Sequence, residues 1–217
     1  MSKEIERRLE RTALIPVLRA SSAEVAHGLV DAMVAGGVEV LEVTMTVPGA
    51  IAILRELKQD FGDRILLGSG TVTTVADCEA TIEAGAEFVV SPSLHLDVIA
   101  ATKRAGKLSI PGALTPTEVM TAWRAGADYV KVFPCSALGG ASYLKALKAP
   151  FPEIRLIPTG GVTLTTAADF LHAGASALGV GTDLVNPAAI IKGEAQTITE
   201  TARRYLQVIA QARVPVS

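Results

Sequence analysis

The chain repeats a short pattern in which a helix-like segment ends at Ala-Gly and an apolar run follows at once. A glycine at this place is typical of a helix C-terminus, where the backbone needs a positive φ and a strand can begin directly afterwards. Successive copies are one or two units of roughly 20–25 residues apart, about the length of one strand plus one helix. The glycines concerned are Gly36, Gly85, Gly106, Gly126 and Gly174. The pattern therefore predicts strands that alternate with helices.

Eight apolar runs occupy the strand positions of this repeat. They are residues 13–18, 38–43, 64–68, 88–90, 108–110, 129–133, 155–158 and 177–180. Capping-box patterns at 21–24 and 115–118 place helix starts after the first and fifth runs. The alternation predicts an α/β fold, a single (β/α)8 TIM barrel over residues 1–217 with an N-terminal helix. The competing architecture is an open doubly wound sheet, but no Gly-x-Gly-x-x-Gly opens the first helix, which argues against it.

Composition and charge narrow the class of protein. Hydrophobic residues make up 49% of the chain and aromatic residues only 4%, so small and β-branched side chains must fill the core, as in buried parallel strands. The formal net charge is −2 and the cations are scattered, which argues against a nucleic-acid or membrane-surface protein. We find no signal-peptide core, no bilayer-length apolar run, and no disulfide or metal pattern in Cys78 and Cys135. These features predict a cytoplasmic protein.

Three charged residues lie in or directly after apolar runs, where burial is costly unless the charge is paired or used. If Lys131 faces the barrel interior, desolvation favours its neutral amine, which can attack a carbonyl. Glu42, in the second run, could relay protons and should then have a pKa above its free value. Arg19 follows the first run, at the end of a barrel where active sites form, and suits a substrate carboxylate or phosphate. The alternative is that these residues form ion pairs or loop contacts that serve only structure.

Two glycine-containing segments, residues 158–162 and 179–183, begin at the ends of the seventh and eighth runs. Glycine lets backbone N–H groups approach an anion closely, and these two loops are the usual phosphate site of barrels. Either segment alone could serve only a turn, but together they predict a phosphorylated substrate. Histidines and carboxylates form no cluster at metal-ligand spacing, so we expect no catalytic metal.

Five phrases occur in order at the expected strand ends, between about residues 15 and 185. They are Leu41-Glu42-Val43-Thr44, Gly68-Ser69-Gly70-Thr71-Val72, Phe88-Val89-Val90-Ser91-Pro92, Lys131-Val132-Phe133-Pro134 and Pro158-Thr159-Gly160-Gly161-Val162. With them the chain resembles the class I 2-keto-3-deoxy-6-phosphogluconate (KDPG) and 4-hydroxy-2-oxoglutarate (KHG) aldolases. The resemblance implies a carbon–carbon lyase that cleaves KDPG to pyruvate and D-glyceraldehyde 3-phosphate through a covalent lysine imine, with no cofactor or metal. It also implies a homotrimer, and cleavage of KHG to pyruvate and glyoxylate stays open.

The resemblance further assigns roles to single residues. It makes Lys131 the Schiff-base lysine and Glu42 the general acid/base, and it implies that Thr71 helps hold the pyruvyl carboxylate. The residues implied around the phosphate are Gly160, Gly161, Gly181 and Thr182. The remaining pocket residues are Thr44, Gly70, Pro92, Phe133 and Thr159.

Two positions bear on the substrate. Some family members carry an arginine four residues after the catalytic glutamate, where this chain has Thr46. Arg19, as in another branch of the family, is therefore the candidate for the substrate carboxylate. The resemblance implies that enzymes acting on the gluconate substrate have a threonine before the Gly-Gly pair, whereas those acting on the galactonate tend to have an apolar residue there. Thr159 therefore favours the gluconate. The C4-epimeric 2-keto-3-deoxy-6-phosphogalactonate stays an alternative substrate.

Two functions of other classes also stay open. A phosphate-binding barrel isomerase or synthase would share both glycine segments, but it gives no reason for a lysine in the middle of the sixth strand. A non-catalytic barrel used as an assembly subunit would leave the site idle. The presence of both Lys131 and Glu42 argues against that second alternative.

Overall fold

The computed structural model describes residues 2–213, in which strands and helices alternate along the chain. The strands are β1 (Leu14–Leu18), β2 (Val40–Thr44), β3 (Leu66–Gly70), β4 (Phe88–Val90), β5 (Leu108–Ile110), β6 (Gly112–Ala113), β7 (Val130–Val132), β8 (Leu156–Pro158) and β9 (Leu178–Val180). The helices are α1 (Ser2–Thr12), α2 (Ala23–Ala35), α3 (Ala50–Phe61), α4 (Val75–Glu83), α5 (Leu96–Arg104), α6 (Pro116–Arg124), the 3₁₀ helix η1 (Cys135–Leu138), α7 (Ala141–Lys148), α8 (Ala167–His172), α9 (Pro187–Ile191) and α10 (Ala195–Ala212).

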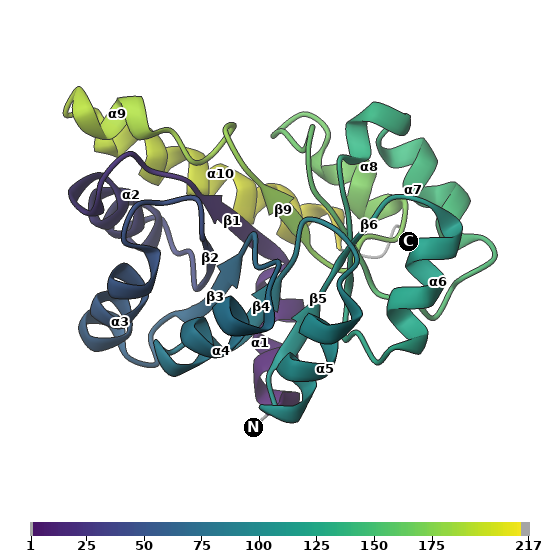
Figure 1. The fold of residues 1–217 in the computed structure, drawn as a ribbon. Helices are drawn as coiled ribbons and strands as arrows, with labels where there is room; N and C mark the ends of the chain where they lie inside the picture. The colour runs from purple at the N-terminus through teal and green to yellow at the C-terminus, as the bar shows by residue number, and fades with distance from the viewer. Residues whose placement is uncertain (1, 214–217) are drawn as a thin grey trace.

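All strand pairs are parallel, and they form two hydrogen-bonded groups. One group has six strands in the order β5-β4-β3-β2-β1-β9, and the other has three in the order β6-β7-β8. β5 and β6 flank Pro111, which has no backbone N–H to continue a ladder. Isolated bridges join Leu156 to Ala175 and Thr159 to Gly179, beside β9. The molecule is therefore an α/β fold with a curled parallel sheet, and most helices lie outside the strands (Figure 1).

The third strand departs from its predicted bounds. The sequence predicts a strand over 64–68 that ends at Gly68, whereas β3 continues to Gly70. That prediction is wrong because both glycines lie inside the strand, where neighbouring side chains fill the space that a Cβ would need. The ring of Phe88 lies against Gly68, and the carboxyl group of Glu42 lies against Gly70. A glycine here marks a close approach and not a turn.

The two predicted capping boxes have different outcomes. At the start of α6, Thr115 accepts a hydrogen bond from the backbone of Glu118 at 3.3 Å, and the Glu118 side chain accepts one from the Thr115 backbone at 2.8 Å, which confirms that box. At the start of α2 the N-cap is Ser22, which accepts from the backbone N–H of Val25 at 3.3 Å. The box predicted at 21–24 is therefore wrong by one residue, because two adjacent serines offer equivalent caps.

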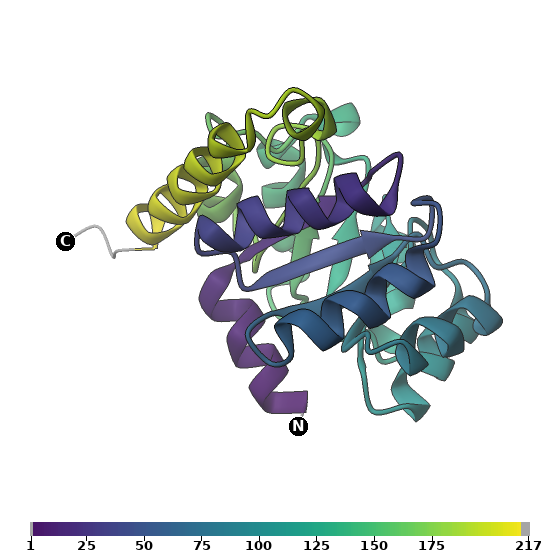
Figure 2. The ribbon, with the colours of Figure 1, turned by 90° about the vertical axis from the view of Figure 1, so that its left-hand side faces the viewer.

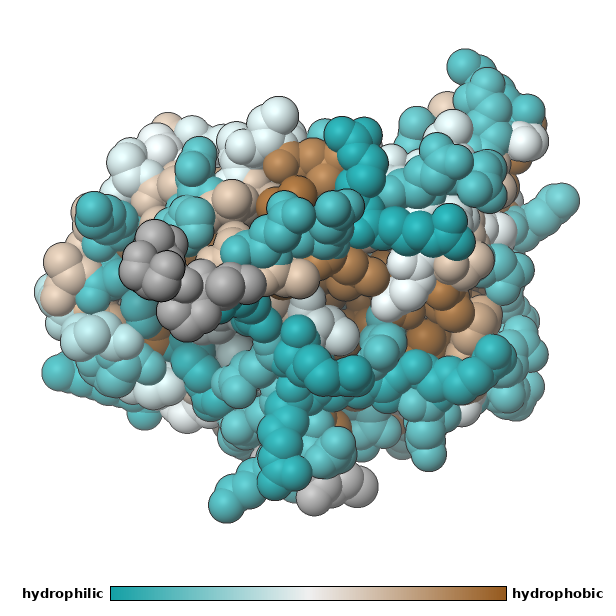
Figure 3. All heavy atoms as spheres, turned by 180° about the vertical axis from the view of Figure 1, so that it is seen from behind, coloured by the Kyte–Doolittle hydropathy of each residue, from teal (hydrophilic) through white to brown (hydrophobic). Residues whose placement is uncertain are grey.

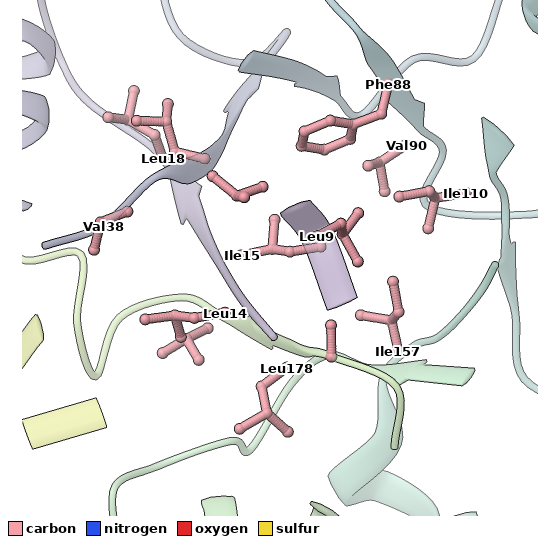
Figure 4. Close-up of a cluster of buried hydrophobic side chains, with 14 of the residues drawn as sticks. Leu9, Leu14, Ile15, Leu18, Val38, Phe88, Val90, Ile110, Ile157 and Leu178 are labelled. Atoms are coloured by element: carbon pink, nitrogen blue, oxygen red, sulfur yellow. The ribbon is translucent and has the colours of Figure 1, made fainter. Parts of the chain in front are cut away.

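Helix α1 closes the amino ends of the strands. The side chain of Leu9, in this helix, is fully buried and lies between Ile15, Ile110 and Ile157 (Figure 4). Ion pairs hold α1 in place. The guanidinium of Arg155, the residue before β8, lies 3.2 Å from a carboxylate oxygen of Glu6 and 3.5 Å from one of Glu10. With this end filled, access to the sheet interior is left at the carboxyl ends.

The remaining helices cover the outside of the sheet. α2 and α3 lie along the outer side of β2 (Figure 2), and α10 packs against α2 and α8. Seen from behind, the surface is mostly hydrophilic, with hydrophobic residues showing between polar ones over the middle of the face (Figure 3). Within residues 2–213, no helix is both long enough and apolar enough to cross a membrane.

Candidate active site

Lys131 and Glu42 face each other inside the sheet. Lys131 lies on β7 opposite Gly112 and Ile157 of the neighbouring strands, and Glu42 lies on β2. The distance between Lys131 Nζ and Glu42 Oε1 is 3.9 Å, and the two side chains are only 8% and 3% exposed. The Oε1 atom finds no hydrogen-bond partner in the described part of the chain. The structure therefore brings the candidate lysine and the candidate carboxylate together.

The surroundings of Glu42 shift its protonation equilibrium. Burial raises the pKa of the carboxyl above its usual value, and the charges of Lys131 and Arg19 lower it in part. The direction confirms the expectation that this group holds its proton more strongly than a free glutamate. A carboxyl group with a raised pKa and a free oxygen is suited to accept and return a proton.

Gly70 on β3 determines where the Glu42 carboxyl can lie, and Thr44 fixes the end of the strand that carries Glu42. Gly70 leaves the space that the carboxyl group occupies, since a Cβ there would overlap Oε1. Thr44 is fully buried, and its hydroxyl donates to the backbone carbonyl of Leu18 at 3.0 Å and lies 2.7 Å from the Thr46 hydroxyl. Thr44 thus links β2 to the end of β1, directly before Arg19. Neither Gly70 nor Thr44 lines the cavity described next.

A cavity of about 260 Å³ opens at the carboxyl ends of β1, β7, β8 and β9. Its polar lining consists of residues predicted for the site: Arg19, Thr159, Gly160, Gly161, Gly181 and Thr182. The cavity is joined to the buried pair by Phe133, which lines it and whose ring centre lies 5.3 Å from Lys131 Nζ. The apolar side, Val17, Val162, Val185 and Pro187, was missed by sequence reasoning. Such residues carry no signal of their own, because any buried strand end would show them.

The loops that follow β8 and β9 present backbone to this cavity. Gly160 and Gly161 have φ angles of +88° and +77°, which side chains with a Cβ rarely adopt. A Cβ on Gly161 would also overlap the side chain of Ser136. Residues 159–161 and 181–182, hereafter the glycine loops, therefore offer peptide groups where other residues would place side chains. Peptide N–H groups without neighbouring side chains can approach an anion closely.

Thr71 and Pro92 lie at the ends of β3 and β4, outside the lining of the cavity. Thr71 has a φ of +60°, an uncommon conformation for a β-branched residue. The backbone of Pro92 packs so closely on Gly112 that a Cβ there would overlap it. A backbone conformation as uncommon as that of Thr71 is often found at functional sites. The structure thus brings these two predicted residues to the same end of the sheet and not into the cavity itself.

A larger depression of about 620 Å³ lies at the opposite end of the molecule, around α1. Its lining is Glu4, Arg7, Arg8, Arg11, Glu39 and Arg64. Arg8 donates to the backbone carbonyls of Asp63 and Arg64, and Arg11 pairs with Glu39. These contacts hold α1 against the sheet. We therefore place the candidate site at the carboxyl ends of the strands.

Residues 2–213 contain no group of three or more His, Cys, Asp or Glu side chains placed to hold a metal ion. Cys78 and Cys135 are both buried free thiols. Burial raises the pKa of Cys135 to about 11, so its reactive thiolate form is disfavoured.

Comparison with known proteins agrees with this geometry. The sequence profile of the KDPG and KHG aldolases matches residues 5–201. The chain belongs to the KDPG and KHG aldolase family. Aldolases of this family are carbon–carbon lyases, so the resemblance seen in the sequence phrases is confirmed.

Individual family members are similar over almost their whole length. The 2-dehydro-3-deoxy-phosphogluconate aldolase of Treponema pallidum is 35% identical over 93% of this chain and 95% of its own. The 2-dehydro-3-deoxy-6-phosphogalactonate aldolase of Escherichia coli is 32% identical over 90% of this chain and 96% of its own. The solved KDPG aldolase of Legionella pneumophila, with pyruvate captured as a covalent carbinolamine, superimposes with a TM-score of 0.85 at 32% identity, covering 92% of this chain and 96% of its own.

Proposed function

We propose that this protein is a class I aldolase that cleaves KDPG to pyruvate and D-glyceraldehyde 3-phosphate. One observation carries the proposal: a buried lysine and a buried carboxyl group, 3.9 Å apart, adjoin a cavity whose far side is made of glycine backbone. A Schiff-base aldolase needs these parts, because the amine activates the ketone, the carboxyl group moves protons, and the peptide groups bind the phosphate.

The reaction begins at Lys131. Its neutral amine adds to the C2 ketone of the substrate, and the carbinolamine loses water to give an iminium ion. The positive nitrogen then accepts the electron pair of the breaking C3–C4 bond, which leaves an enamine of pyruvate on the lysine. Protonation of the enamine at C3 and hydrolysis of the resulting iminium release pyruvate and restore the amine. Lys131 is the covalent catalyst, so the reaction needs no cofactor or metal.

Glu42 moves the proton that permits this cleavage. As a carboxylate it takes the proton of the C4 hydroxyl, directly or through a water, while the C3–C4 bond breaks and C4 becomes an aldehyde. The unpartnered Oε1 atom is the acceptor on the side of Lys131. The raised pKa of this carboxyl supports the role, since its carboxylate is then a stronger base for the C4 hydroxyl proton than a free glutamate would be.

We assign the two anionic ends of the substrate to different groups. The phosphate lies against the glycine loops, with Gly160, Gly161 and Gly181 donating backbone N–H groups and Thr182 its hydroxyl. The carboxylate lies toward Thr71 and Arg19. Arg19 lines the same cavity as the glycine loops, so the phosphate is its alternative partner.

The variant Arg19→Leu separates these two assignments. If Arg19 binds the carboxylate, the KM for unphosphorylated KHG rises about tenfold, as it does for KDPG, because both substrates carry that group. If Arg19 binds the phosphate instead, the KM rises for KDPG alone. Pyruvate release from each substrate is the measurement.

Thr159 bears on the choice between the two epimers. It is 7% exposed, lines the cavity, and its hydroxyl occupies the space beside Gly179. We propose the gluconate compound as the preferred substrate on this residue, with the galactonate compound as the alternative. A comparison of kcat/KM for the two phosphorylated epimers tests the choice. A preference for the galactonate compound would overturn it while leaving the aldolase chemistry intact.

Several wider properties follow from the same proposal. We propose that the two groups of strands belong to one closed (β/α)8 barrel over the whole chain, and the bridges beside β9 support this. We also propose a cytoplasmic homotrimer, on the family resemblance and the free thiols. Size-exclusion chromatography with light scattering measures the mass of the assembly.

Assays distinguish the rival functions. Cleavage of KDPG in the presence of a chelator, with inactivation by borohydride in the presence of pyruvate, is expected of a Schiff-base aldolase. An isomerase or synthase would not be inactivated in this way, and an assembly subunit with an idle site would release no pyruvate. Either result would overturn the proposed function.

A further inference from the structure

The two glycine loops are tied together a second time, away from the sheet. They begin at a backbone bridge between Thr159 and Gly179. Beyond that bridge, Asp183, directly after Thr182, accepts a hydrogen bond from the backbone N–H of Leu164 at 3.2 Å. The loop after β9 is thus fastened to the loop after β8 on both sides of the cavity-lining glycines.

The same carboxylate oxygen is held by a third element. Tyr205 of α10 donates its hydroxyl to Asp183 Oδ2, the atom that accepts from Leu164. Tyr205 is fully buried. Burial and the hydrogen bond to Asp183 both raise the pKa of the phenol, so it remains a donor throughout the physiological range. Helix α10, which lies behind β9 in the view of Figure 1 and packs against α2 and α8, therefore fixes a point between the two loops.

The chemistry of the loops makes such a fixed point useful. Gly160 and Gly161 adopt left-handed conformations and have no side chains. Their carbonyls accept hydrogen bonds from the Ser136 backbone N–H and the Thr166 hydroxyl, both at 3.2 Å, which hold the loop after β8 to η1 and to the start of α8 but not to the loop after β9. A negative charge next to a phosphate site would by itself repel the phosphate. Asp183 is therefore better explained as an acceptor that holds two loops than as a group that binds the ligand.

We propose that Asp183 and Tyr205 are positioning residues for the substrate phosphate: they hold the two glycine loops at the separation that the phosphate requires. The proposal rests on the proposed function, in which these loops bind that phosphate. Neither side chain touches the reacting atoms. Their loss should weaken recognition of the phosphate and leave the chemistry at Lys131 unchanged.

The test compares Tyr205→Phe with wild type on KDPG and on unphosphorylated KHG. Removing one hydrogen bond to a carboxylate is expected to raise the KM for KDPG about tenfold, with kcat within about twofold. Kinetics on KHG should stay within about twofold of wild type, and competitive inhibition by inorganic phosphate should weaken in parallel with KDPG binding.

A matched control is available at the opposite end of the sheet. Tyr129 is also fully buried, and its hydroxyl donates to a carboxylate, that of Glu10 in α1, at 3.2 Å. Tyr129→Phe removes the same kind of hydrogen bond far from the glycine loops. We expect it to lower the thermal stability without changing the KM of either substrate.

Two variants of Asp183 separate its role as an acceptor from its charge. Asp183→Asn keeps an oxygen acceptor and is expected to retain a KM near that of wild type, whereas Asp183→Ala should raise the KM for KDPG as Tyr205→Phe does. If both variants instead lower the KM, charge repulsion dominates and the proposal is wrong. It is equally wrong if Tyr205→Phe changes nothing, or raises the KM for KDPG and KHG alike. Failure of the wild type to cleave KDPG would instead overturn the proposed function.

Discussion

At the base of the site, Lys131 and Glu42 are ionisable side chains buried among apolar strands, whereas at the rim Gly160 and Gly161 bring backbone with no side chain at all. Burial of charge is costly, and it changes the reactivity of the groups that bear it. Positive φ angles without a Cβ cost mainly conformational entropy, and they let peptide groups approach a ligand. The base is thus suited to bond making and bond breaking, and the rim to binding.

The difference determines what each region should tolerate. At the base the chemical group matters, so a substitution of equal volume should remove activity and leave the fold intact. At the rim the absence of a side chain matters, so adding a single methyl group should weaken binding and leave the chemistry intact. Variants with the opposite effects would show that chemistry and binding are not divided between the base and the rim.

The largest effect is expected at Lys131. Lys131→Met keeps a chain of similar length without an amine, so no imine can form and kcat should fall on the order of 10⁵-fold. The variant should remain folded, because methionine fills a similar volume and the Glu42 carboxyl can stay protonated once the cation beside it is gone. Steady-state pyruvate release and circular dichroism provide the two readouts. Activity retained in a folded variant would remove Lys131 from the mechanism.

Glu42→Gln should have the next largest effect. The amide occupies the same space but cannot take the C4 hydroxyl proton, so kcat should fall about 10³-fold with KM little changed. Because Lys131 is still present, the variant should still form a reducible imine with pyruvate. Loss of imine formation in parallel with turnover would show that Glu42 acts before the cleavage step.

At the rim, Gly161→Ala tests the contribution of the backbone. The added Cβ is incompatible with a φ of +77° and overlaps Ser136, so the peptide groups must move, and the KM for KDPG should rise about 10- to 100-fold. The matched control is Gly126→Ala, whose φ is +93° but whose Cβ would meet open space before β7. That control should destabilise the fold through the same backbone strain and leave both KM values unchanged. Equal changes in KM for Gly161→Ala and Gly126→Ala would mean that the Gly161 variant acts through the overall stability of the fold and not through the phosphate site.

The smallest expected effect concerns stability and pH. Folding raises the Glu42 pKa, so the stabilisation from its protonated form is complete below the unfolded-state value of 4.5 and is lost as the pH rises through the folded-state value. The unfolding free energy of Glu42→Gln, relative to wild type, should therefore increase by about 1.4 kcal/mol for each pH unit between these two pKa values. Chemical denaturation at a series of pH values measures it.

Glu118 supplies a control of opposite sign for this measurement. Backbone hydrogen bonds from Thr115 and Leu114 lower the Glu118 pKa, so its contribution is present above pH 4.5 and lost as the pH falls. The stability of Glu118→Gln relative to wild type should thus decrease as the pH rises. If the stability difference of both variants changed with pH in the same direction, the trend seen for Glu42→Gln could not be assigned to the Glu42 pKa.

The sequence predicted the parts of the molecule that depend on local spacing. The Ala-Gly repeat predicts where the strands lie, and a lysine in an apolar strand stands out because buried charge is rare. The bounds of β3 were missed because the glycines at 68 and 70 leave space for side chains of other strands. Phe88 fills the space at Gly68, and Glu42 fills the space at Gly70. Contacts of this kind arise only when the chain is folded.

The rim was predicted less completely for the same reason. The glycines of the two loops are visible in the sequence, but the carboxylate that ties the loops together is not. Asp183 meets Tyr205 and Leu164 across three separate elements, and no spacing rule connects them. The shared position of Arg19 and the glycine loops in one cavity also follows only from the folded structure.

Reductive trapping of pyruvate tests whether Lys131 forms the imine. Borohydride reduces an imine to a stable amine, so the adduct adds the mass of pyruvic acid less one oxygen atom to the modified lysine. Trypsin does not cut after an alkylated lysine, so the label should appear on an uncut peptide spanning residues 125–145. We expect this label on Lys131 in the wild type and none in Lys131→Met. A label on another lysine, or none in an enzyme that still cleaves KDPG, would contradict it.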